Sequence, residues 1–205
     1  IAAQPRVPEQ VWHAVEAMPR DSTPMAMLAS AMLSMEHESG FAQRFEEGVA
    51  RDDYWEATLE DALRLLGALP TLAGGIYHLR YGKGPRLAHD PAFDWAENFG
   101  HMLGVRDPLF ASAFRRAAIL QSDHEGGNVW AFTCHVVGSV LSNPYLAVSA
   151  GFNGLAGPLH GRSGQESTQW VLGAMERYGG VPTHEQVEAY AWETLNAGRV
   201  VPGHG

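Results

Sequence analysis

The sequence contains very little cysteine and no long apolar run. Cys134 is the one cysteine in 205 residues, so no disulfide forms within the chain, which favours a reducing compartment. Gly, His or Thr interrupts the longest apolar stretches well short of the roughly 20 residues that a membrane-spanning helix requires, and we expect no membrane insertion. The chain opens at Ile1 without a charged leader and an apolar segment, so we expect no intact targeting signal in these residues; a removed transit peptide fits the same start.

Basic residues are also scarce. The sequence has 14 Lys and Arg against 23 Asp and Glu, which gives a formal net charge of -9. Proteins that bind nucleic acids usually present a basic face to the phosphates, so we expect no nucleic-acid partner. A few local arginines and helix N-termini still suffice to bind an anionic substrate.

Several catalytic signatures are absent from the sequence. It has no HExxH motif or Cys/His cluster that would bind zinc, and no Gly-x-Ser-x-Gly nucleophile elbow. Its glycine-rich segments lack the lysine of a phosphate-binding loop. We therefore expect no metal.

Apolar residues recur at helical spacing nearly throughout, and strands are hard to find. Ser22-Thr23-Pro24 is typical of a helix start, and Pro182-Thr183 followed by Glu185 and Gln186 gives another that stops at Gly198. The expected helices lie near 9–17, 25–33, 54–66, 72–79, 94–103, 109–121 and 183–197, with breaks at Gly, Pro and Asp and a surface loop over 82–91. The predicted fold class is all-α.

Two histidines stand at turns that flank an apolar stretch. His124 lies in Ser-Asp-His-Glu-Gly-Gly-Asn, and His160 lies in Gly-Pro-Leu-His-Gly. The stretch between them is long enough for two helices, so the two imidazoles could face one cleft. We expect packed, buried helices over 128–142 and 144–153, in close approach at Gly138, Ser139, Ala147 and Ala150.

His124 and Asn128 form the first candidate site. The imidazole and the Asn128 amide could both donate to one carboxylate or carbonyl near a helix N-terminus, where the helix dipole favours anions. The alternative is structural, with Asp123 and His124 simply capping the helix.

His160 is the second candidate. The preceding Gly-Pro-Leu restricts the backbone and holds the side chain in one direction. A neutral imidazole N–H held in this way stabilises an oxygen that becomes anionic, as the formation of an enol or enolate from a thioester requires. The alternative is a turn histidine that makes a backbone hydrogen bond.

Two further segments have both a functional and a structural interpretation. Arg199 to Gly205 contains Val-Val-Pro-Gly-His-Gly, whose glycines either allow a ligand close to the backbone or form an ordinary loop after a helix. Arg51 beside Asp52 and Asp53 has, by itself, the pattern of a solvated ion pair.

Together these motifs closely resemble the mitochondrial, eukaryotic type of citrate synthase. The strings SDHEGGN, HVVGSVLSNPYL, NGLAGPLHG and TLNAGRVVPGHG carry the resemblance. It extends upstream, less densely, through Phe41-Ala42, Glu47-Gly48, Arg51, Tyr54-Trp55 and residues 94–104, so it spans the chain. The resemblance implies that residues 1–161 belong to a large helical domain. Residues 162–205 would then begin an incomplete small helical domain, with a hinge over 161–164.

The resemblance also implies the reaction and the roles of the residues. Acetyl-CoA and oxaloacetate would condense with water to citrate and CoA, with no metal and with the coenzyme A thioester as substrate. His124 and His160 would be catalytic: His124 would bind oxaloacetate together with Asn128, and His160 would stabilise the enol. The implied coenzyme A contacts are Arg51, Leu159, Val200, Val201, Gly203 and Gly205.

Part of the family's active site would lie beyond Gly205, namely the catalytic aspartate, a second oxaloacetate histidine and the arginines that bind the substrate carboxylates. His204 falls where the family usually has tyrosine. We therefore expect residues 1–205 alone to be inactive. Two alternatives stay open: a truncated or diverged homologue that acts as a structural or interaction subunit, and a 2-methylcitrate synthase. The resemblance further implies a homodimer, possible membership of a larger assembly, and a location in the mitochondrial matrix, or in the cytoplasm if the protein is bacterial.

Overall fold

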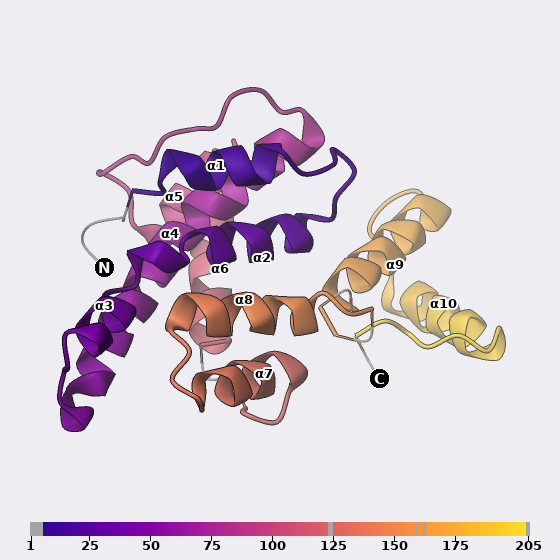
Figure 1. Ribbon diagram of the computed structural model, residues 1–205. Helices are drawn as coiled ribbons and strands as arrows, with labels where there is room; N and C mark the ends of the chain where they lie inside the picture. The colour runs from indigo at the N-terminus through magenta and orange to yellow at the C-terminus, as the bar shows by residue number, and fades with distance from the viewer. Residues whose placement is uncertain (1–5, 123–124, 159, 162, 204–205) are drawn as a thin grey trace. The chain divides into compact units, whose positions relative to one another are not determined.

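The chain folds into helices, as the computed structural model shows for residues 6–122, 125–158, 160–161 and 163–203 (Figure 1). These residues contain no strand, which agrees with the predicted all-α class. No helix in this described part is long and apolar enough to cross a membrane. The elements are α1 (Glu9–Glu16), α2 (Pro24–Ser34), η1 (Glu36–Glu38), α3 (Gly40–Glu46), η2 (Arg51–Asp53), α4 (Tyr54–Tyr81), α5 (Trp95–Met102), α6 (Pro108–Leu120), α7 (Val129–Gly138), α8 (Pro144–Leu155), α9 (Ser163–Tyr178) and α10 (His184–Asn196).

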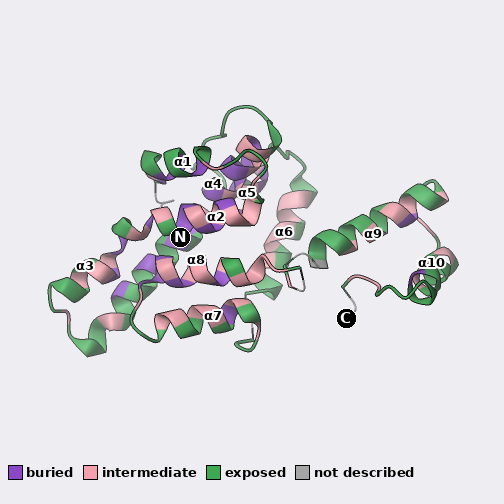
Figure 2. Cartoon of the chain, turned by 45° about the vertical axis from the view of Figure 1, so that its right-hand side comes forward, coloured by how far each residue is buried: buried purple, intermediate pink, exposed green. Residues whose placement is uncertain are grey.

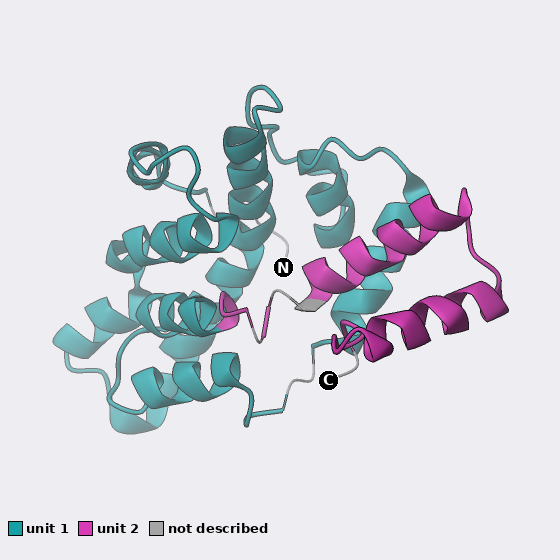
Figure 3. Cartoon of the chain, turned by 90° about the vertical axis from the view of Figure 1, so that its right-hand side faces the viewer, with its two compact units in different colours: residues 1–154 teal, residues 155–205 magenta. Residues whose placement is uncertain are grey.

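The chain divides into two compact units, residues 1–154 and residues 155–205 (Figure 3). The division lies a few residues before the predicted domain boundary at 161/162, and the assignment of residues 1–161 and 162–205 to two family domains stays a prediction. Ser163 and Gly164, which were predicted to lie in a hinge, form the first residues of α9.

The helix starts follow the capping signals in the sequence. The Thr23 hydroxyl accepts a hydrogen bond from the Ala26 amide, and Pro24 occupies the first helical position of α2. Asp94 and Thr183 each open a helix with a reciprocal capping box. Because these caps satisfy amides that the helix itself leaves free, the starts of the helices could be predicted from local sequence.

The predicted break between residues 66 and 72 is wrong, because α4 runs without interruption through Pro70. Proline has no N–H, so the carbonyl of Leu66 lacks its usual partner four residues later. The indole Nε1 of Trp95 donates to that carbonyl at 2.9 Å. A side chain from α5 thus supplies the missing hydrogen bond and makes the proline tolerable inside the helix.

Helix α4 is the axis of the first unit, and two adjacent glycines set how closely its neighbours approach. A Cβ at Gly74 would lie 2.7 Å from Cβ of Met102 on α5, and a Cβ at Gly75 would overlap the indole of Trp12 on α1. Met102 and Trp12 are both buried, and buried residues gather along α4 (Figure 2). His78 reinforces the α5 crossing through a 2.9 Å hydrogen bond between Nε2 and the Met102 carbonyl.

Arg86 ties the loop after α4 to α1. Its guanidinium carbon lies 4.3 Å from the ring centroid of Trp12, and its two terminal nitrogens contact Glu9 and Glu16 at 3.2 and 3.0 Å. The predicted surface loop over 82–91 is confirmed, since the chain has no helix between Tyr81 and Trp95 and most of these residues are exposed.

A buried carboxylate joins α3 to α4. Asp61 is fully buried in α4 and accepts hydrogen bonds from the Ser39 hydroxyl at 2.7 Å and from the amides of Gly40 and Phe41 at 2.9 and 3.1 Å. These amides belong to the start of α3 and would otherwise lack acceptors. Burial next to Asp61 raises the pKa of Tyr145 on α8 to about 12.

The predicted buried pair of helices is confirmed for α8 and wrong for α7. Helix α8 buries Tyr145, and the Ser149 hydroxyl donates to the Ala29 carbonyl of α2 at 2.8 Å. Helix α7 buries only Ala131. Of the residues predicted at the close approach of the two helices, Gly138 does not take part, since a Cβ there would meet nothing within 4 Å. A Cβ at Gly151 of α8 would overlap Cys134 of α7.

In the second unit, α9 and α10 form a hairpin closed by Gly179 and Gly180, which both have positive φ. The rings of Trp170 and Tyr190 lie 4.9 Å apart, and Arg177 pairs with Glu193 at 2.6 Å. Several large apolar side chains on the hairpin are exposed, among them Val171, Leu172, Trp192 and Leu195.

We predict that Gly75→Ala destabilises the protein by roughly 1 to 3 kcal/mol, because a methyl group would overlap the Trp12 ring inside a packed crossing. The measurement is urea-induced unfolding followed by circular dichroism. Gly164→Ala is the matched control, since that helical glycine has open space around it and alanine is the better helix former. Equal loss of stability in both variants would contradict the role of Gly75.

Candidate active site

His160 lies in a tight turn that follows α8. The Gly161 amide donates to the Leu155 carbonyl at 2.9 Å, and the His160 amide donates to the Gly157 carbonyl at 3.1 Å. A Cβ at position 161 would overlap the Leu155 carbonyl, so only glycine fits there. The turn therefore fixes the backbone from which the imidazole projects.

The imidazole of His160 has an unusual environment. Its Nε2 is buried and has no hydrogen-bond partner among the described residues. Buried side-chain nitrogens nearly always have a partner, so Nε2 of His160 is a candidate for a hydrogen bond to a ligand, although Nδ1 of the core residue His78 has no partner either. The hydrogen bond from the His160 amide to the Gly157 carbonyl is the one expected of a purely structural turn histidine. It does not account for the ring nitrogen, which has no partner among the described residues.

Asn128 occupies the N-cap of α7, as predicted. Its Oδ1 accepts from the Ala131 amide at 3.0 Å, and its Nδ2 donates to the Glu125 carbonyl at 2.7 Å. The side chain is thereby held at the start of the helix with one Nδ2 hydrogen left for a further acceptor. His124 lies outside the described residues, so the predicted pairing of His124 with Asn128, and of His124 with His160 in one cleft, stays a prediction.

Arg51 begins the short helix η2 and is exposed. No ion pair joins it to Asp52 or Asp53 in the part of the chain that the structure describes, so the solvated ion pair suggested by the sequence does not form. The guanidinium stays available to an anion.

The segment after α10 is anchored to the hairpin. The amides of Gly198 and Arg199 donate to the carbonyls of Leu195 and Thr194 at 2.9 and 3.2 Å. Val200 is exposed, Val201 is half-buried, and Gly203 has a φ of 86°. Leu159 and Gly205 lie outside the described residues, and their predicted coenzyme A contacts stay predictions.

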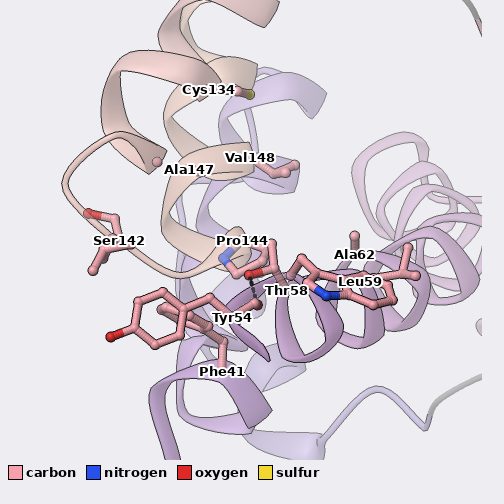
Figure 4. Close-up of a pocket in the computed structure, with 13 residues that line it drawn as sticks. Phe41, Tyr54, Thr58, Leu59, Ala62, Cys134, Ser142, Pro144, Ala147 and Val148 are labelled. Atoms are coloured by element: carbon pink, nitrogen blue, oxygen red, sulfur yellow. Dashed lines mark hydrogen bonds between the residues drawn. The ribbon is translucent and has the colours of Figure 1, made fainter. Parts of the chain in front are cut away.

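The first unit also contains an apolar cleft of about 600 Å³ that sequence reasoning missed (Figure 4). Phe41, Tyr54, Trp55 and Leu59 line it from α3 and α4, and Cys134, Leu141, Pro144 and Val148 line it from α7, α8 and their connection. None of the predicted site residues that the structure describes lines this cleft. It has no charged residue to bind a dicarboxylate, so it does not fit oxaloacetate. No group of three or more potential metal ligands occurs among the described residues.

Comparison with known protein families identifies the family of this chain. The family profile described as "Citrate synthase, C-terminal domain" matches residues 1–205. The chain belongs to the citrate synthase family. This confirms the family that the sequence motifs indicated.

Individual relatives agree. The mitochondrial citrate synthase of Saccharomyces cerevisiae is 45% identical over 205 residues, which are 100% of this chain and 43% of that protein. The peroxisomal citrate synthase of the same yeast is 42% identical over 100% of this chain and 45% of that protein. The chain thus spans less than half the length of the citrate synthases that it matches.

The fold agrees as well. The citrate synthase of Thermoplasma acidophilum, solved as a ternary complex with carboxymethyl coenzyme A and oxaloacetate, superimposes with a TM-score of 0.70 at 21% identity. The match covers 97% of this chain and 48% of that one. At this identity the likeness concerns the fold.

Cys134 is predicted to react slowly with thiol reagents at neutral pH. Burial raises the pKa of its thiol, so less reactive thiolate is present at a given pH than in an exposed cysteine. We expect labelling by 5,5′-dithiobis(2-nitrobenzoate) at pH 7 to be slower than in urea, and to speed up at alkaline pH. Peptide mass spectrometry locates the label, and equal rates with and without urea would contradict the prediction.

Proposed function

We propose that the protein containing this chain is a citrate synthase, which condenses acetyl-CoA with oxaloacetate and water to give citrate and CoA. The observation that carries the proposal is His160: a closed glycine turn holds a buried, unpartnered ring nitrogen in a chain that belongs to this family. The coenzyme A thioester is a substrate, and no metal is required.

In the proposed reaction, a carboxylate takes a methyl proton of the thioester, His160 hydrogen-bonds the thioester oxygen as the enol forms, and His124 binds oxaloacetate. Asn128 supports the oxaloacetate site with its remaining amide hydrogen. A fixed donor is effective because it is already aimed at the oxygen where negative charge develops. Arg51 would contact coenzyme A phosphates, while Leu159, Val200, Val201, Gly203 and Gly205 would contact the rest of the nucleotide.

The mitochondrial relatives support a location in the mitochondrial matrix as part of the same proposal. The two compact units support the assignment of a large and a small helical domain with a boundary near residue 161.

We predict that His160→Ala lowers kcat about 100- to 1,000-fold and leaves the KM for oxaloacetate nearly unchanged, because the lost hydrogen bond concerns charge that develops during the reaction. The assay measures CoA release by the complete native protein. His184→Ala, at an exposed histidine in the same unit, is the matched control and should retain full activity.

Two outcomes would overturn the proposal. No CoA release from acetyl-CoA and oxaloacetate by the complete protein would favour a non-catalytic homologue. Higher kcat/KM with propionyl-CoA than with acetyl-CoA would instead identify a 2-methylcitrate synthase.

We also propose that the protein is a homodimer that uses the exposed apolar faces of the first unit. Val129, Phe132 and Val136 recur at three- and four-residue steps on one face of α7, and all three are exposed, as is Val140 just after the helix. Trp55, Leu59, Leu63 and Leu66 form a second exposed row on α4. Such rows are uncommon on monomers and mark contact surfaces.

We predict that Phe132→Glu converts the dimer into a monomer, because a carboxylate would lose its water in an apolar interface. Sedimentation equilibrium of the complete native protein measures the mass of the assembly. Leu120→Glu is the matched control, since Leu120 is a highly exposed leucine at the end of α6 and outside both rows. A wild-type monomer, or a Phe132→Glu dimer of unchanged affinity, would contradict this proposal.

A further inference from the structure

The segment from Arg199 to Gly203 is bonded at its first end to Thr194 of α10, which α9 contacts in turn, and lies against α9 at its other end. At the first end, the Arg199 amide donates to the Thr194 carbonyl at 3.2 Å, and the Thr194 hydroxyl in turn accepts from the Trp170 indole Nε1 at 3.0 Å. At the other end, a Cβ on Gly203 would lie 2.8 Å from the Ser167 Oγ. The segment therefore lies directly against Ser167.

The two anchoring residues belong to the same face of α9. Ser167 and Trp170 are three residues apart, which places them next to each other on the helix surface. Thr194 is buried between the two helices, so the first anchor is shielded from water. Val200, between the anchors, is 69% exposed and free to contact a ligand.

We propose that Ser167 and Trp170 are positioning residues that fix the shape of the 199–203 segment and thereby set the affinity for the coenzyme A thioester. This inference rests on the proposed function, in which Val200, Val201 and Gly203 contact the nucleotide. A segment fixed before the ligand arrives loses less conformational freedom on binding, so loosening it weakens binding.

The first test is kinetic and uses the complete native protein. Trp170→Phe removes the indole donor and keeps an aromatic ring against Tyr190, and Ser167→Leu adds bulk where Gly203 lies. Trp170→Phe should raise the KM for acetyl-CoA and the Kd for CoA by about fivefold, the effect of one net hydrogen bond, and Ser167→Leu should raise both values through its added bulk. The kcat and the KM for oxaloacetate should stay within about twofold.

Gln169→Leu is the matched control. Gln169 is exposed and lies two residues from Ser167, so it points away from the segment on the same helix. Parallel changes in kcat and both KM values, or a Gln169→Leu effect as large as that of Ser167→Leu, would show a general structural role and overturn the proposal.

The second test does not depend on activity. Trypsin cleaves after Arg199, and cleavage requires the backbone to detach from its anchors. We expect cleavage after Arg199 to be about fivefold faster in Trp170→Phe and Ser167→Leu than in the wild type and Gln169→Leu, as measured by mass spectrometry. Equal cleavage rates in all four proteins overturn the anchoring. Faster cleavage together with no binding of CoA by the wild type would leave the anchoring intact and refute the proposed function.

Discussion

The close approach of helices to α4 is the constraint on which the first unit depends. Gly74 lets the backbone of α5 at Met102 come close to α4, and Gly75 leaves room for the Trp12 indole of α1. With the helices this close, Arg86 reaches both Trp12 and the acidic residues of α1, and His78 reaches the Met102 carbonyl. The polar contacts of Arg86 and His78 thus occur at the same places as this close packing.

The candidate active-site residues lie where helices begin or end. Asn128 opens α7, His160 follows the end of α8 within a closed turn, and the 199–203 segment leaves the end of α10. Backbone amides and carbonyls are only free at helix ends, so these are the places where an all-helical protein can present oriented polar groups to a ligand. The apolar cleft between α4 and α7 has no such groups, and its exposed surroundings suit protein contact better.

Local sequence predicted what local chemistry determines. The caps at Thr23 and Thr183 could be predicted because capping depends on a few neighbouring residues. The continuity of α4 could not be predicted in this way, because it depends on Trp95, which is 25 positions from Pro70. The exposure of α7 could not be predicted either. An apolar pattern in the sequence does not say whether another part of the same chain covers the helix. The motifs indicated the family and the place of His160 in a turn, but not its orphaned ring nitrogen, which depends on tertiary packing.

The hydrogen bond from Trp95 to Leu66 makes two distant positions interdependent. Proline at position 70 leaves one carbonyl in the middle of a long helix without its usual partner, and Trp95 at the start of α5 donates to it. A residue with a backbone N–H at position 70 would compete with the Trp95 indole for the Leu66 carbonyl. A residue without a side-chain donor at position 95 would leave that carbonyl without a hydrogen bond. Pro70, a residue type that usually breaks helices, thus leaves free the carbonyl to which a side chain of α5 binds.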